Sequence, residues 1–144
     1  MELQPKVEKI HLNLAGKRVL FVDQSSLTTG LVHFMKTMEK LDVTQLDNLI
    51  GITDLADFME QNRLNFAIIH NATLEEANVI TDAFQKGKMI VVQEKNSDLE
   101  LNRKFNKVMK TAGIKTFPRA EPDHLTAFKK CLDYLSAFTR GKIK

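Results

Sequence analysis

Residues 18–23 read RVLFVD, an apolar run that ends in an aspartate, and this stretch decides the fold. Two similar runs follow, NFAIIH at residues 65–70 and KMIVVQ at residues 88–93. Nearly continuous apolar runs rich in Val and Ile are typical of strands covered on both faces in a parallel sheet. Weaker runs lie at residues 43–46 and 114–117. The sequence therefore predicts five strands.

Helical periodicity fills the intervals between these runs. The first helix is expected after Asp23, with Ser25 or Ser26 as its N-cap. Capping-box patterns open the third and fourth helices at residues 73–76 and 97–100, and glycines are expected to end them. Five β-α units predict an α/β fold: a doubly wound, five-stranded parallel sheet in the order 2-1-3-4-5, with helices on both faces.

The composition places this fold in one soluble, cytoplasmic domain. The chain has 144 residues, 43% of them hydrophobic, and a net charge of +3. No apolar run is long enough to span a membrane, and no signal peptide is recognisable. The lone Cys131 excludes an intrachain disulfide and a multi-thiolate metal site, and we expect it to be an inert thiol. We expect the domain over residues 17–139, an arm or extra edge strand over residues 1–16, and a basic tail over residues 140–144.

The order of elements resembles the receiver domain of bacterial response regulators over residues 17–139. The likeness rests on GKRVLFVDQS at residues 16–25, on the NFAIIH strand at the phosphoacceptor position, and on Ala-Gly at residues 112–113. Receivers accept a phosphoryl group on an Asp after the third strand and hold Mg²⁺ with two acidic residues after the first. A Thr or Ser after the fourth strand and a Lys after the fifth contact the phosphate. The resemblance therefore implies a flavodoxin-like fold and a role in two-component signalling.

The residues of that pocket are mostly replaced in this chain. Of the family pattern, only the carboxylate that directly follows the first strand is kept. The corresponding positions hold Asp23, Gln24, His70 followed by Asn71, Gln93 and, near the Lys position, Arg119. One carboxylate is too few to hold Mg²⁺, which gives up its water reluctantly. We therefore expect a degenerate receiver, or pseudo-receiver, without aspartyl phosphorylation and without a cofactor.

Asp23 and His70 are expected to lie close together at the carboxyl edge of the sheet, where open α/β folds bind ligands. A histidine beside a carboxylate can be an acid/base pair, a phosphohistidine or a metal ligand. The interpretation we favour is structural: His70 donates a hydrogen bond and fills the former acidic pocket. No metal site is expected, because the other histidines are scattered over different elements (His11, His33, His124).

A basic stripe is expected on the fourth helix, on the side opposite Leu101 and Phe105. Its members, Arg103, Lys107 and Lys110 with Lys104 beside them, recur at helical spacing. Such a stripe is usually a solvated face, but in receivers this surface commonly binds a partner or a second copy. An acidic protein partner would fit it. Nucleic acid is not expected, because no aromatic residues are interleaved with the cations.

The sequence thus predicts a non-phosphorylatable signalling module that acts by protein–protein contact, with a partner protein or as a homodimer. The alternative is a small-ligand-binding or phosphotransfer enzyme that uses Asp23, His70 and Gln93. A flavodoxin-like protein without receiver ancestry is a third interpretation, and it predicts a ligand in the loops after the first and third strands. No glycine-rich phosphate cradle follows the first strand, because Gly30 is the first glycine after it.

Overall fold

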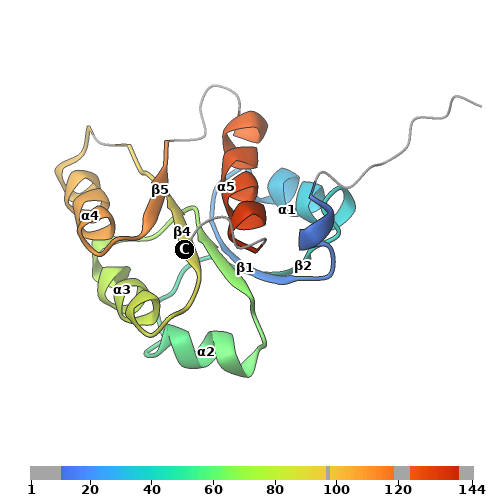
Figure 1. Cartoon of the computed structure of the whole chain (residues 1–144). Helices are drawn as coiled ribbons and strands as arrows, with labels where there is room; N and C mark the ends of the chain where they lie inside the picture. The colour runs from blue at the N-terminus through green and yellow to red at the C-terminus, as the bar shows by residue number, and fades with distance from the viewer. Residues whose placement is uncertain (1–10, 97, 119–123, 140–144) are drawn as a thin grey trace, which may run out of the picture.

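Five parallel strands alternate with five helices in the computed structural model, which describes residues 11–96, 98–118 and 124–139 (Figure 1). The strands are β1 (Arg18–Val22), β2 (Asp42–Leu46), β3 (Phe66–Ile69), β4 (Ile90–Gln93) and β5 (Lys115–Phe117). The helices are α1 (Thr28–Thr37), α2 (Leu55–Gln61), α3 (Ala77–Gln85), α4 (Glu100–Thr111) and α5 (His124–Thr139). The sheet order is β2-β1-β3-β4-β5. The predicted α/β fold, with flavodoxin-like topology, is confirmed.

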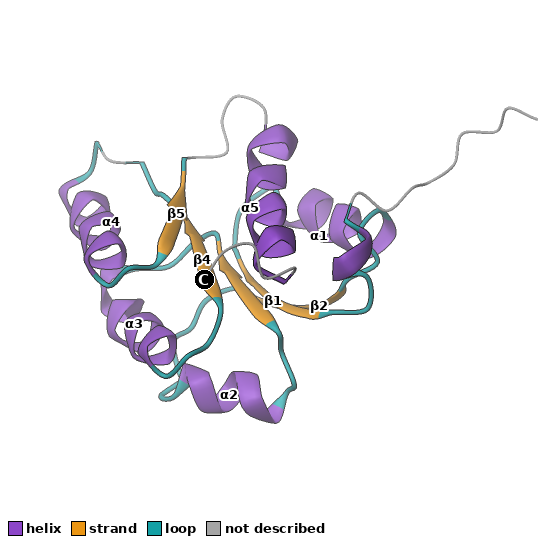
Figure 2. Cartoon of the chain, in the orientation of Figure 1, coloured by secondary structure: helices purple, strands orange, loops and turns teal. Residues whose placement is uncertain are grey.

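Helices cover both faces of the sheet, as Figures 1 and 2 show. Side chains alternate along each strand, so β1 sends Leu20 and Val22 to one face and Val19 and Phe21 to the other. The first pair packs with residues of α2, α3 and α4, and the second with residues of α1 and α5. One apolar cluster therefore packs on each face of the sheet.

Register brings the carboxyl ends of β1 and β3 side by side. Val22 pairs with Ile69, and the backbone N–H of His70 donates to the carbonyl of Val22 at 2.8 Å. The next residues of the two strands, Asp23 and His70, consequently leave the sheet at the same height. This register therefore brings Asp23 and His70 together at the carboxyl edge of the sheet.

The start of α1 differs from the prediction. The helix begins at Thr28, and its N-cap residue is Leu27, which makes no side-chain capping bond. Neither Ser25 nor Ser26 is therefore the N-cap. The Ser25 hydroxyl donates to Asp23 at 2.7 Å and accepts from the backbone N–H of Leu27 at 3.2 Å, so it ties the loop before the helix to the carboxylate.

The predicted boundaries of α3 are largely correct. The capping box formed by Thr73 and Glu76 is present, although it opens a short 3-10 turn (Leu74–Glu76) directly before α3. Gly87 follows the end of the helix with a φ of 94°, a left-handed conformation that glycine adopts without strain. Gly113 ends α4 in the same way, with a φ of 87°.

The beginning of α4 is less well predicted. The expected N-cap at residue 97 lies outside the described residues, and the helix begins at Glu100. Leu101, expected on the inner face, is 64% exposed, whereas Phe105, Asn106 and Met109 are buried. The prediction for Leu101 is wrong, and a polar residue, Asn106, lies in the buried face.

The N-terminal segment packs against α5 through a short 3-10 helix (Leu12–Leu14) and, over residues 11–16, forms no strand. Leu14 is fully buried. The His11 ring lies between two carboxylates, with Nδ1 3.0 Å from Glu39 and Nε2 2.6 Å from Asp133. The rest of the predicted arm (1–10) and the basic tail (140–144) lie outside the described residues.

The inner side of α5 carries the cysteine. Cys131 is fully buried, and burial raises the pKa of its thiol to about 12. A thiol that stays protonated at neutral pH is a poor nucleophile, in keeping with the inert role predicted for it. In the described parts of the chain, no helix combines the length and apolar character that a membrane crossing requires.

Candidate functional site

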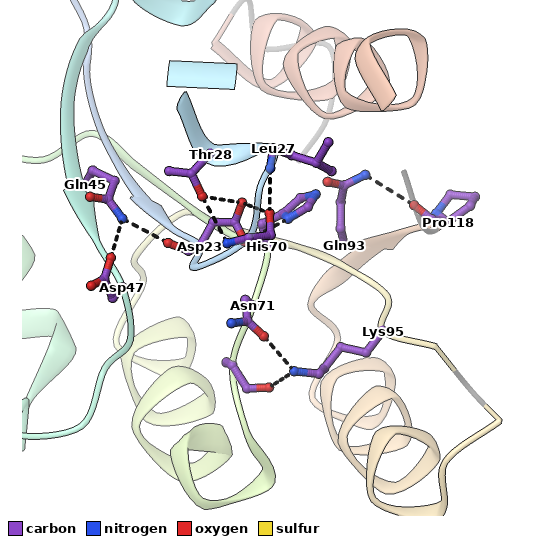
Figure 3. A network of polar contacts seen from close by, with 12 residues as sticks. Asp23, Leu27, Thr28, Gln45, Asp47, His70, Asn71, Gln93, Lys95 and Pro118 are labelled. Atoms are coloured by element: carbon purple, nitrogen blue, oxygen red, sulfur yellow. Dashed lines mark hydrogen bonds and ion pairs between the residues drawn. The ribbon is translucent and has the colours of Figure 1, made fainter. Parts of the chain in front are cut away.

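Asp23 is a fully buried carboxylate at the carboxyl end of β1. Its Oδ2 accepts hydrogen bonds from the hydroxyls of Ser25 at 2.7 Å and Thr28 at 2.9 Å (Figure 3). Its backbone carbonyl accepts from the Gln45 amide on β2 at 2.9 Å. The loop after β1 and the first residue of α1 thus fold around the carboxylate, which Ser25 and Thr28 both contact.

His70 faces Asp23 from the end of β3. Its Nδ1 lies 3.3 Å from Asp23 Oδ1, and its side chain is only 11% exposed. The ring also packs near Phe21, with 5.9 Å between ring centroids. The histidine therefore occupies the space beside the carboxylate with an aromatic ring and one polar contact.

The contacts around Asp23 keep it ionised. Burial alone would raise the pKa of Asp23, but the contact with His70 and the hydroxyls of Ser25 and Thr28 outweigh burial and lower it. The carboxylate is consequently an anion at neutral pH. Its partners are two uncharged hydroxyls and an imidazole, all supplied by the chain itself.

Gln93 lies at the end of β4 on the other side of His70 (Figure 3). It is 2% exposed, and its amide donates to the carbonyl of Pro118 at 3.3 Å. Three polar atoms that face inward here are buried without a hydrogen-bond partner among the described residues: Gln93 Oε1, His70 Nε2 and Asp23 Oδ1, the last of which has only the 3.3 Å contact with His70 Nδ1. Gln24 is exposed, and Arg119 lies outside the described residues.

Lys95 is a residue of this edge that the sequence analysis did not identify. It follows β4 by two positions, and its Nζ donates to Asn71 Oδ1 at 2.9 Å and to the carbonyl of Ala72 at 2.5 Å. Burial lowers the pKa of Lys95, while the charges of Glu76 and Asp23 act in the opposite direction. The signal in the sequence was its position just past a buried strand, at the same edge as Asp23.

The residues present do not fit Mg²⁺. Asp23 is the one acidic side chain among the predicted pocket residues, and its Oδ2 already accepts two hydroxyls. An ammonium, Lys95, bonds the carbonyl of Ala72 and the side chain of Asn71, oxygens that would suit a hard cation. Within the described residues, no group of three His, Cys, Asp or Glu side chains has a metal-binding arrangement.

The Asp23–His70 contact has the form of an acid/base pair, but the histidine nitrogen that points away from Asp23, Nε2, is buried. An imidazole that transfers a proton to a substrate must bring the nitrogen opposite its carboxylate within hydrogen-bond reach of that substrate. Nε2 of His70 is buried in this conformation. In this structure the ring of His70 thus fills the space beside Asp23, and its Nε2 has no hydrogen-bond partner among the described residues.

The predicted basic stripe lies on the exposed side of α4, where Arg103, Lys104, Lys107 and Lys110 are all exposed. Lys110 pairs with Glu94 at 2.9 Å, and Lys104 pairs with Glu100 at 3.5 Å. Arg103, Lys107 and Lys110 line a shallow surface hollow together with Glu94. The stripe is thus a mixed but mainly positive surface.

No family model matches the chain, and comparison with curated proteins also finds no match. The candidate site therefore rests on its own geometry. Of the predicted pocket residues, Asp23, His70, Asn71 and Gln93 come together at one edge of the sheet. Gln24 makes no contact of this kind among the described residues.

Proposed function

We propose that the chain is a receiver-like signalling module that acts by protein–protein contact and does not accept a phosphoryl group on aspartate. The observation that carries the proposal is the inward-facing Asp23–His70 contact at 3.3 Å, at the position where receivers have their phosphoacceptor. The sheet order and the placement of the site at the carboxyl edge support the receiver interpretation.

The chemistry of phosphoryl transfer explains why this arrangement is unsuited to it. A phosphoryl donor brings several negative charges, which a divalent cation and a lysine or arginine must neutralise in the transition state. Here the pocket offers a buried anion, Asp23, that is already hydrogen-bonded by Ser25 and Thr28. The Lys95 ammonium at this edge is already bonded to Asn71 and to the carbonyl of Ala72, so a phosphoryl group would meet the charge of Asp23 with no divalent cation to offset it.

Signalling then depends on a surface, and α4 offers the most suitable one. Its basic stripe (Arg103, Lys104, Lys107 and Lys110) complements an acidic protein surface. Charge complementarity of this kind speeds association and selects partners, and salt weakens it when the charges are exposed. The partner is accordingly a protein with an acidic face, or a second copy whose acidic residues meet the stripe.

The test of docking is a charge reversal on α4 matched by one on the opposite face of the sheet. Lys107→Glu changes the stripe, whereas Lys36→Glu changes a lysine on α1 that is also exposed. The tagged wild-type chain is used to capture partners from extract of its own cell, and its mass in solution is measured in parallel. We expect Lys107→Glu to lose the captured protein, or the dimer mass, while Lys36→Glu retains it.

Two further observations complete that test. Capture by the wild type is expected to weaken as salt is raised from 50 to 300 mM, because exposed charges are screened. Equal capture by both variants at every salt concentration would show that α4 is not the docking surface. Absence of both a partner and a dimer from the wild type would remove the support for a docking function.

A further inference from the structure

The Lys95 side chain connects two loops at the carboxyl edge of the sheet. It stands on the loop after β4, and its ammonium bonds Asn71 Oδ1 and the carbonyl of Ala72 on the loop after β3 (Figure 3). Hydrogen bonds from a charged donor are stronger than those between neutral groups. Two such bonds from one ammonium therefore form a crosslink between β3 and β4 beyond the end of their own ladder.

The backbone of Lys95 is held from the other side by α4. The Asn106 side chain accepts from the N–H of Lys95 at 3.2 Å and donates to its carbonyl at 3.2 Å. Asn106 is 7% exposed, so this two-point contact is shielded from water. The Lys95 ammonium also lies 5.9 Å from the centre of the Phe105 ring on the same helix. Lys95 thus contacts the loop after β3 and α4 at once.

Glu76 joins the loop after β2 to the carboxyl edge of the sheet. Its carboxylate accepts from the backbone N–H of Thr73 at 2.7 Å and from the backbone N–H of Leu49, which lies after β2. Glu76 is 5% exposed, and its negative charge acts on Lys95. Burial lowers the pKa of Lys95, and the negative charges of Glu76 and Asp23 offset part of that cost of burying the ammonium.

We propose that the Lys95 ammonium is the resident cation of this site, a tethered charge that holds the loop after β3 to the loop after β4 and to α4 in a single arrangement. A metal ion can dissociate, and a loop that depends on it can then change its arrangement. A covalently tethered ammonium is always present. The site is accordingly locked, and no ion or phosphoryl group is needed to order it.

The consequence for α4 rests on the proposed function. Asn106 faces inward to Lys95, and the basic stripe lies on the outer side of the same helix. A fixed Lys95 therefore fixes the helix that carries the stripe. The docking face is presented constantly, and partner binding is controlled by the amounts of the two proteins rather than by modification of the pocket.

The lock is tested by removing the charge and keeping the length of the side chain, with Lys95→Met, and by Lys104→Met as the matched control on α4. Amide hydrogen exchange reports the opening of each loop. The backbone N–H of Asn71 donates to the carbonyl of Val22, that of Thr73 to Glu76, and that of residue 95 to Asn106, so these amides report on the two loops that Lys95 joins. In Lys95→Met we expect these amides to exchange about tenfold faster than in the wild type, because the charged hydrogen bonds of Lys95 are lost. The amides of β1 serve as the reference for any general change in stability. Lys104→Met should exchange like the wild type.

If Lys95→Met does not fold, a measurement on the wild-type protein tests the role of Lys95 instead. The ammonium protons of Lys95 should give a separate, slowly exchanging nitrogen–proton signal under conditions where the Lys104 signal is lost to water. Adding Mg²⁺ should not move the amide signals of Asn71 and Ala72. A Lys95 ammonium that exchanges as fast as Lys104, unchanged loop exchange in Lys95→Met, or saturable Mg²⁺ shifts at Asn71 would each overturn the lock. The first two outcomes leave the proposed docking function standing, since that function is tested by Lys107→Glu.

Discussion

Asp23 is the residue in which burial and hydrogen bonding oppose each other most directly. Its side chain is fully buried, yet its pKa is held below the ordinary value of 3.8 by His70, Ser25 and Thr28. A carboxylate with a lowered pKa stabilises the folded state at every pH above its unfolded pKa. That stabilisation is lost as the pH falls from the unfolded value through the folded one.

Asp23→Asn should therefore lower the free energy of unfolding by about 1.5–3 kcal/mol at pH 7, the usual worth of hydrogen bonds to a charged group. The deficit should shrink as the pH falls below about 4, because the wild-type carboxyl then becomes neutral as well. Urea unfolding of both proteins at pH 7, 4 and 3 measures this. Ser26→Ala, at an exposed position of the same loop, is the control. A deficit independent of pH would contradict the account of Asp23.

At the scale of elements, α4 shows where apolar periodicity succeeds and where it fails. The periodicity correctly placed Phe105 on the buried face, but it also placed Leu101 there, which is 64% exposed. Asn106 takes part in the buried face because its amide pairs with the backbone of Lys95, outside the helix. A buried amide with a long-range partner leaves no mark in the hydrophobic pattern.

Asn106→Ala should destabilise the fold by about 1–3 kcal/mol, because it leaves the N–H and the carbonyl of Lys95 without their partner. Asn102→Ala, one turn earlier on α4 and partly exposed, is the matched control and should change stability by less than about 0.5 kcal/mol. Thermal or urea unfolding of the two variants provides the comparison. Equal stability of both would mean that the Asn106 contact does not hold α4 to the loop after β4.

At the scale of the whole molecule, the fold could be predicted because its signals are local and repeated. Buried strands such as β1 and β3 are nearly continuous apolar runs, and their alternation with helices leaves few topologies open. The approach of Asp23 and His70 followed from that topology, since parallel register places the ends of neighbouring strands together.

The rest of the site could not be predicted because it depends on loop conformation. Whether Ser25 is the N-cap of α1 is decided by the path of the five residues between β1 and α1. Lys95 reaches Asn71 across two loops, 24 positions apart in the sequence, and nothing in the residues near Lys95 indicates that contact. Such contacts are set by tertiary geometry rather than by local pattern.

The central claim, that the pocket does not accept a phosphoryl group on aspartate, is tested most directly by intact-mass measurement after incubation with acetyl phosphate and Mg²⁺. We predict that the wild-type chain keeps its original mass, with or without Mg²⁺, and that Asp23→Asn and His70→Ala behave in the same way. A phosphorylated species that forms only with Mg²⁺ and is lost in Asp23→Asn would contradict the account. One that is lost in His70→Ala and is labile to acid would instead establish the phosphotransfer alternative.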